Sequence, residues 1–262
     1  MNTYQGKMVL VTGASSGIGL EMSKALAARG ANVIITARSE GKLNALADEL
    51  RQTGVEAHVF AGDLSQTGTA QALFDWTVEQ GLTVDLLINN AGYGKWGKFS
   101  KFDRDTYNNM IQLNINALTE LCHLFVEGMA ERGDGGIINV GSTASFVPVP
   151  YSAVYGATKA YVIMLSEALN AEYRDRGVHV MTLCPGATES GFQAVAGGEN
   201  AEISGADTSE FVAVAGLDAF LEGKLTIITG RQNQMMGLFP RFLSRQQALN
   251  MVVSRTKERF DI

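Results

Sequence analysis

The sequence predicts an α/β domain built on a doubly wound parallel sheet of about seven strands, with helices on both faces. Short apolar runs rich in valine and isoleucine alternate with stretches of good helix formers along most of the 262 residues. Such runs are typical of strands that are buried on both faces of a parallel sheet. Strict alternation of strand and helix, joined by right-handed crossovers, places helices on both faces. The length allows a single domain over residues 1–262.

The expected elements follow one another in order from the first buried run, Lys7–Thr12. Several polar or glycine-rich motifs stand where a predicted strand ends, which is where a doubly wound sheet binds its ligand. A further helical stretch is expected in a C-terminal extension at about 231–262. Strands are expected at about 7–12, 32–37, 55–60, 84–89, 135–141, 178–184 and 225–229, and helices at about 17–29, 40–53, 65–80, 103–131, 151–175 and 207–222.

A glycine-rich loop follows the first strand. Lys7–Thr12 runs directly into Gly13-Ala-Ser-Ser-Gly17-Ile-Gly19, and Leu20–Arg29 then has helical apolar spacing. Strand, glycine loop and helix together form the context of a dinucleotide fingerprint. Gly13 would permit the tight turn, while Gly17 and Gly19 would let the backbone approach a pyrophosphate at the positive end of the helix. A glycine-rich turn without a ligand is the alternative.

Tyr155 and Lys159 stand four residues apart in a predicted helix, with Ser142 thirteen positions upstream. Residues at i and i+4 share one helix face, so the ammonium can lie near the phenol. A free tyrosine titrates near pH 10, and a nearby cation lowers that pKa toward the range of general acid–base catalysis. Taken alone, the pair also fits a surface lysine beside a half-buried tyrosine.

Bulk properties exclude several classes. The net charge of −6 argues against non-specific binding of nucleic acid. No signal-peptide pattern and no uncharged apolar run of about 20 residues is visible, so we expect a cytoplasmic protein without stable membrane insertion. Cys122 and Cys184 are expected to be buried thiols. The three histidines show no metal-ligand spacing, and no metal site is predicted; they are His58, His123 and His179.

Several motifs recur together in an order that is similar to one family. Thr12–Gly19 resembles the cofactor loop of the short-chain dehydrogenase/reductase family, in its single-domain branch, and the resemblance extends over about residues 5–230. It implies a Rossmann fold, a nicotinamide cofactor and a homodimer or homotetramer. The further elements that carry the resemblance are Asp63-Leu64, Asn89-Asn-Ala-Gly92, Asn114, Ser142, Tyr155, Lys159 and Pro185-Gly186.

The resemblance also implies where a nicotinamide cofactor binds. Asp63 and Leu64 would bind the adenine edge, Asn90 and Gly92 would line the ribose side, and 185–190 would hold the carboxamide. Asn89 could equally well satisfy loop backbone. The predicted cofactor residues are Gly13, Ser15, Ser16, Gly17, Ile18, Gly19, Arg38, Asp63, Leu64, Asn90, Ala91, Gly92, Ile115, Tyr155, Lys159, Pro185, Gly186, Thr188 and Ser190.

The end of the second strand favours NADP(H) over NAD(H). The position at which dinucleotide folds often carry an acid for the ribose 2′-OH is occupied by Ala37, and Arg38 follows it. A guanidinium can bind a 2′-phosphate through a forked contact and can stack on adenine. Glu40 is expected in the first turn of the next helix, behind Ser39 as a cap.

The implied reaction is hydride transfer between the cofactor and a carbonyl or secondary alcohol. In the reductive direction Tyr155 would protonate the carbonyl oxygen and Ser142 would hydrogen-bond it. Lys159 would bind the nicotinamide ribose and lower the Tyr155 pKa. Asn114 would hold a water that links the lysine to solvent. A non-catalytic NADP-binding sensor and a nucleotide-sugar epimerase or dehydratase are the alternatives.

The predicted substrate residues are mainly apolar or aromatic, which fits a hydrophobic ketone or aldehyde. Part of the set would come from a substrate loop at about 190–207, whose residues 194–200 are expected to move as a lid. The apolar and basic C-terminal tail is expected to pack on the domain or on a partner subunit, with a membrane or lipid contact as the alternative. The substrate candidates are Tyr93, Trp96, Phe146, Val149, Tyr151 and Phe192.

Overall fold

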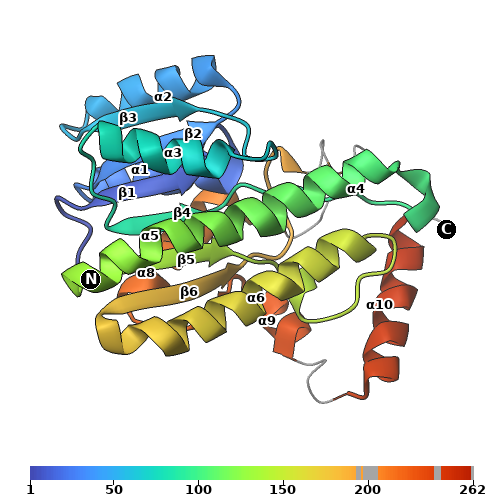
Figure 1. The fold of residues 1–262 in the computed structure, drawn as a ribbon. Helices are drawn as coiled ribbons and strands as arrows, with labels where there is room; N and C mark the ends of the chain where they lie inside the picture. The colour runs from blue at the N-terminus through green and yellow to red at the C-terminus, as the bar shows by residue number, and fades with distance from the viewer. Residues whose placement is uncertain (193–195, 197–205, 239–242, 261–262) are drawn as a thin grey trace.

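A single parallel sheet of seven strands forms the centre of the molecule, in the order β3-β2-β1-β4-β5-β6-β9 (Figure 1). The computed structural model describes residues 1–192, 196, 206–238 and 243–260. The predicted fold class is confirmed. The sheet strands are β1 Met8–Thr12, β2 Asn32–Ala37, β3 Ala57–Ala61, β4 Leu86–Asn89, β5 Gly135–Val140, β6 Val178–Cys184 and β9 Thr226–Ile228, and a separate short pair is formed by β7 Thr188–Glu189 and β8 Asp207–Thr208.

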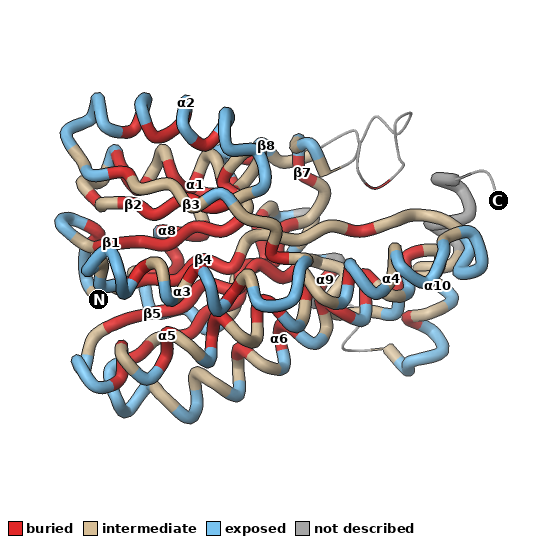
Figure 2. The backbone as a smooth tube through the Cα atoms, turned by 45° about the horizontal axis from the view of Figure 1, so that its top comes forward, coloured by how far each residue is buried: buried red, intermediate tan, exposed pale blue. Residues whose placement is uncertain are grey.

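Two hydrophobic cores lie on opposite faces of the sheet because successive side chains of a strand point to opposite faces. Val9 and Val11 of β1 pack into the core that α1, α2 and α8 cover, whereas Leu10 packs into the core beneath α3, α5 and α6. Figure 2 shows the buried residues following the strands. The helices are α1 Gly17–Ala28, α2 Glu40–Arg51, α3 Thr69–Glu79, α4 Arg104–Ile111, α5 Leu118–Arg132, α6 Ala153–Tyr173, α8 Ser209–Leu221, α9 Arg231–Leu238 and α10 Arg245–Phe260.

The structure corrects two predicted helices. The continuous helix expected at 103–131 is divided by a π-helical segment, η2, at Gln112–Ala117. A π turn inserts an extra residue into the helix, and such turns are frequent at functional sites. The helix expected at 65–80 begins only at Thr69, because Gly68 before it has a φ of 86°. Local apolar periodicity does not reveal either interruption.

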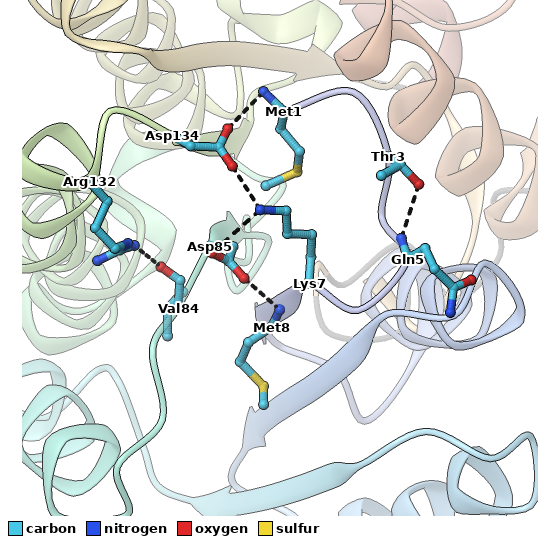
Figure 3. A network of polar contacts seen from close by, with 9 residues as sticks. All are labelled: Met1, Thr3, Gln5, Lys7, Met8, Val84, Asp85, Arg132 and Asp134. Atoms are coloured by element: carbon cyan, nitrogen blue, oxygen red, sulfur yellow. Dashed lines mark hydrogen bonds and ion pairs between the residues drawn. The ribbon is translucent and has the colours of Figure 1, made fainter.

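Ion pairs join the amino ends of the central strands, at the edge opposite the carboxyl ends (Figure 3). The Lys7 ammonium lies 2.7 Å from one Asp134 oxygen, and the Met1 amino group lies 3.0 Å from the other. Asp85 accepts a 2.9 Å hydrogen bond from the Met8 amide. The Lys7 contact lowers the pKa of Asp134. Both side chains are partly exposed, so each pair contributes at most about 1 kcal/mol.

The C-terminal helices lie away from this edge. Figure 1 shows α9 and α10 at the end of the molecule where α6 begins. Within the described ranges, no helix has both the length and the apolar character that crossing a bilayer requires.

A glycine before β6 allows a close approach between two backbone segments. Gly177 has a φ of 79°, and a Cβ there would lie 2.0 Å from the Gly133 carbonyl oxygen. Gly223 has a similar φ of 72°, but a Cβ there would meet no described atom within 4 Å. We expect Gly223→Ala to cost about 1 to 2 kcal/mol for the left-handed conformation alone. Gly177→Ala should cost distinctly more in urea unfolding, and equal losses would contradict the backbone contact.

Candidate active site

A cavity of about 980 Å³ opens at the carboxyl ends of the strands. It extends from the glycine loop after β1 to the N-terminal part of α6, and most of the predicted cofactor residues line it. Gly19 and Ile115 are not among the lining residues. Those predicted residues that line it are Gly13, Ser15, Ser16, Gly17, Ile18, Arg38, Asp63, Leu64, Asn90, Ala91, Gly92, Ser142, Tyr155, Lys159, Pro185, Gly186, Thr188 and Ser190.

The glycine loop has the conformation that a close phosphate approach requires. Gly13 and Gly17 have φ angles of 69° and 57°, and α1 begins at Gly17. A Cβ on Gly19 would lie 2.5 Å from the Gly13 carbonyl oxygen, so this glycine permits packing within the loop. Within the described residues, the Ser16 side chain makes no capping bond to the first turn of α1. The free amides of this helix N-terminus therefore suit a pyrophosphate.

Asn90 supports the glycine loop and also lines the cavity. Its amide Nδ2 donates to the carbonyl oxygens of Thr12 at 2.8 Å and Gly13 at 3.3 Å. Strand β4 pairs with β1, so the amide saturates the turn after β1. Asn89 is buried and donates to Asn139 Oδ1 at 2.9 Å. Its side chain therefore has a structural role between strands β4 and β5.

The predicted acid Asp63 and the predicted arginine Arg38 both line the cavity. Asp63 accepts hydrogen bonds from the amide and hydroxyl of Ser65, at 3.0 and 2.7 Å, which fixes the carboxylate. Arg38 lines the cavity beside Ala37. Glu40 begins α2 with Ser39 at the N-cap position, as the sequence predicted, and does not line the cavity.

Asn114 is buried in η2, and its side chain is held by protein groups. Its Oδ1 accepts from the Tyr93 amide at 3.1 Å, and its Nδ2 donates to the Tyr93 carbonyl at 2.9 Å. Nδ2 also donates to Thr158 Oγ1 at 3.1 Å. The π turn directs the amide at the loop after β4, and the water-holding role stays a prediction. Asn114 thus fixes the Tyr93 backbone beside the cavity.

Ser142, Tyr155 and Lys159 meet at the end of β5. Ser142 Oγ accepts from the Ala144 amide at 3.1 Å and is hydrogen-bonded to Tyr155. Lys159 Nζ donates to the Val140 carbonyl at 2.7 Å and lies 5.9 Å from the centre of the Tyr155 ring. The helix α6 and the strand β5 therefore bring the three side chains together, as their i, i+4 spacing and strand-end position suggested.

Burial controls the protonation of this site. It raises the pKa of Tyr155 to about 12, with the Ser142 hydrogen bond acting in the opposite direction, and it lowers the pKa of Lys159 to about 8. The expected lowering of the Tyr155 pKa by the lysine is wrong for this structure. The ammonium is bonded to Val140 rather than to the phenol, so desolvation dominates.

The loop after β6 carries the residues predicted to face the nicotinamide. The Thr188 hydroxyl donates to the Gly186 carbonyl at 3.1 Å, and Ser190 Oγ accepts from the Phe192 amide at 3.3 Å. Asn233 of α9 lies against Gly186, where any Cβ would overlap its side chain. Asn233 also lines the cavity. Asn233 was not among the predicted site residues, because no local sequence pattern connects α9 with the loop after β6.

Three aromatic residues among the predicted substrate residues line the cavity. Tyr93, Trp96 and Phe192 line it, and the Phe192 ring centre lies 5.5 Å from that of Tyr155. Val149 lines it as well. Most of the predicted substrate loop and lid, 193–195 and 197–205, lies outside the described residues.

Phe146 and Tyr151 do not line this cavity, contrary to prediction. Phe146 packs against Ile163, Cys184 and Ile228 on the far side of the loop. Tyr151 has a φ of 64°, and its carbonyl oxygen accepts from the Gly97 amide at 2.8 Å, so the local turn places it elsewhere. The positions of Phe146 and Tyr151 in the sequence do not indicate which side chains of the segment between β5 and α6 face the cavity.

Helix α10 contributes two further lining residues, Met251 and Val252. The predicted packing of the tail on the domain is therefore found at the cavity itself. In the sequence, Met251 and Val252 are marked only as two adjacent apolar residues, which does not indicate a contact with the cavity.

Comparison with known proteins gives the family. The sequence model described as short chain dehydrogenase matches residues 7–200. This chain belongs to the short-chain dehydrogenase family. It is an oxidoreductase of that family, and the matched segment contains the glycine loop, Ser142, Tyr155 and Lys159.

Relatives in the short-chain dehydrogenase family extend the similarity into the tail. The ketoacyl reductase HetN of Nostoc sp. is 32% identical over 89% of this chain and 81% of its own length. A short-chain dehydrogenase from Sphingobium yanoikuyae, solved with NADPH, covers 98% of this chain and 96% of its own, with a TM-score of 0.81 and 31% identity. A Burkholderia phymatum enzyme solved with NAD has a TM-score of 0.84 and 25% identity, with 96% of each chain covered.

The buried lysine should make this short-chain dehydrogenase less stable near neutral pH. An unfolded lysine keeps its proton up to its ordinary pKa of 10.5, whereas folded Lys159 releases it near 8. The unfolded state therefore binds more protons between these values, and stability rises with pH across that window. We expect Lys159→Met to raise the free energy of unfolding near neutral pH by on the order of 2 kcal/mol, after loss of the Val140 bond.

Urea unfolding near pH 7 and near pH 10 measures this effect. The difference between Lys159→Met and the parent should shrink at the higher pH. Exposed Lys42 on α2 provides the control, and Lys42→Met should change stability little at either pH. A Lys159→Met protein that is less stable than the parent near pH 7 would contradict the desolvation cost.

Proposed function

We propose that this chain is an NADP(H)-dependent oxidoreductase that interconverts a carbonyl group and a secondary alcohol, and that it reduces a hydrophobic ketone or aldehyde. The observation that carries the proposal is the Tyr155 phenol, hydrogen-bonded to Ser142 and placed beside Lys159 on the wall of the 980 Å³ cavity. The aromatic lining residues Tyr93, Trp96 and Phe192 support an apolar substrate.

The cavity suits a nicotinamide dinucleotide along its length. The positive φ angles of Gly13 and Gly17 and the uncapped start of α1 would hold the pyrophosphate. Asp63 and Leu64 would hold the adenine, and the loop from Pro185 to Ser190 would hold the carboxamide. The bound cofactor would supply the hydride.

The side chains would manage the proton on the carbonyl oxygen. With a pKa raised to about 12, Tyr155 is a neutral phenol at physiological pH and can donate its proton to that oxygen. The Ser142 hydroxyl would donate a hydrogen bond to the same oxygen and hold it in line. Lys159 would keep a positive charge beside the phenol and favour the phenolate that forms. Asn114 acts as a positioning residue through the Tyr93 backbone.

Arg38 supports NADP(H) as the cofactor. Its position on the cavity wall after Ala37 leaves no acid at the site where dinucleotide folds bind the ribose 2′-OH. The NADPH complex of the Sphingobium relative is consistent with this assignment, while the Burkholderia phymatum relative was solved with NAD. Arg38 is therefore the residue on which the proposal of NADP(H) rests.

Tyr155→Phe should lower carbonyl reduction by at least about 100-fold, because a positioned proton donor contributes roughly 10² to 10⁴ in rate. The measurement is NADPH oxidation with a panel of hydrophobic ketones and aldehydes. Tyr161→Phe is the matched control, since Tyr161 lies on the same helix with its hydroxyl 2.9 Å from Thr119 Oγ1. Near-parent turnover by Tyr155→Phe would refute the mechanism.

Arg38→Ala should weaken NADPH binding about 10- to 100-fold, because hydrogen bonds to charged groups contribute roughly 1.5 to 3 kcal/mol. NADH binding should change less than about threefold. Titration of both cofactors by fluorescence would measure this, with Arg104→Ala on exposed α4 as the charge control. An equal loss of affinity for NADPH and NADH would contradict the proposal that Arg38 binds the 2′-phosphate.

A further inference from the structure

A second cavity of about 510 Å³ lies against the first. Its lining is almost entirely apolar, and Arg245 at the exposed start of α10 is the one charged residue among the described residues that form it. The size lies within the range of small-molecule pockets, about 300 to 1,000 Å³. The lining residues are Ser145, Phe146, Val147, Pro148, Val149, Pro150, Ala153, Gly156, Ala157, Ala160, Leu243, Arg245, Ala248 and Leu249.

The two cavities share part of their walls. Val147 and Val149 line both. Val149 packs against α6 at Gly156, where a Cβ would lie 3.0 Å from Val149 Cγ2. Tyr155 lines the first cavity together with Val147 and Val149, so the shared wall and the phenol belong to one cavity.

Helix α10 is the second shared element. Ala248 and Leu249 line the second cavity, and Met251 and Val252 line the first. Their spacing of i, i+1, i+3 and i+4 places them on one face of the helix. A single apolar face therefore extends from one cavity to the other.

The side of the second cavity formed by α6 consists of small residues. Ala153, Gly156, Ala157 and Ala160 leave the space that larger side chains would fill. Because the interior has no charge, burial of a polar or ionic group there would be unfavourable. An unbranched hydrocarbon chain matches both the apolar lining and the absence of charged side chains other than Arg245 among the described lining residues.

We propose that the second cavity binds the distal alkyl chain of the substrate, while its carbonyl lies at Tyr155. The chain would cross the Val147–Val149 wall and pack along the apolar face of α10. The substrate class is then a long-chain ketone. This inference rests on the proposed carbonyl reduction, and it assigns substrate recognition to α10, which lies beyond the segment matched by the family.

A series of methyl ketones from 2-butanone to 2-dodecanone tests the inference with the full-length protein and NADPH. Each methylene that enters the cavity should raise kcat/KM about three- to fourfold, until the cavity is filled. Ala248→Phe places a large side chain in the cavity. In this variant kcat/KM should no longer increase from short to long ketones. Asn250→Phe is the control on another face of α10, where Asn250 is exposed, and it should keep that increase.

A second variant protects the test against misfolding of Ala248→Phe. Leu249→Ala removes apolar contact from the same cavity and should lower kcat/KM for 2-decanone about 5- to 20-fold relative to 2-butanone. Thermal unfolding would establish that each variant is folded. A parent enzyme that reduces short ketones but shows no gain with chain length would overturn the inference and leave the proposed function intact.

Failure of the proposed function would give a different result. If NADPH binds and no ketone is reduced, displacement of the apolar fluorophore 1-anilinonaphthalene-8-sulfonate by 2-decanone tests the cavity directly. Displacement from the parent and from Asn250→Phe, but not from Ala248→Phe, would support the alkyl-chain site without the reaction. Absence of displacement from the parent would overturn it.

Discussion

The site depends on the way helix α6 is held against strand β5. Lys159 donates to the Val140 carbonyl, and one strand residue earlier Asn139 donates to Ser166 Oγ at 2.9 Å. Ser166 lies about two turns beyond Lys159 on the same helix, so these two bonds fix both its position and its rotation. Tyr155 is carried by that helix and Ser142 by the loop after that strand. A shift of α6 would therefore separate the phenol from the serine.

The same docking explains the protonation of the site. Close packing on the sheet removes Tyr155 and Lys159 from water, and desolvation disfavours the charged form of each. A phenolate without a direct ionic partner is then costly, so the phenol keeps its proton at neutral pH. Lys159 is buried in an environment that destabilises its protonated form and lowers its pKa. This pattern is typical of a functional charge, because an apolar residue would be more favourable for folding.

The two halves of the cavity have different origins in the chain. The glycine loop, Ser142, Tyr155 and Lys159 lie in the segment that the short-chain dehydrogenase family shares. Asn233, Met251 and Val252 come from α9 and α10, beyond that segment, and they line the same cavity. Residues from both parts of the chain therefore meet in one cavity.

The sequence by itself determined the fold class, the order of strands and helices, and the clustering of most predicted cofactor residues. These follow from local patterns, since a buried valine-rich run and a glycine loop are defined by neighbours in the chain. It also placed Ser142, Tyr155 and Lys159 together, because strand ends and i, i+4 spacing have fixed geometry.

Only the tertiary structure decided which way individual side chains face and how strongly they are desolvated. Asn90 turns to Thr12, Asn114 turns to Tyr93, and Phe146 lines the second cavity instead of the first. The Tyr155 pKa rises instead of falling, and α10 reaches the cavity. Each of these outcomes depends on contacts between segments far apart in the chain. Hydrogen-bond partners and burial are properties of that packing, and no local sequence pattern specifies them.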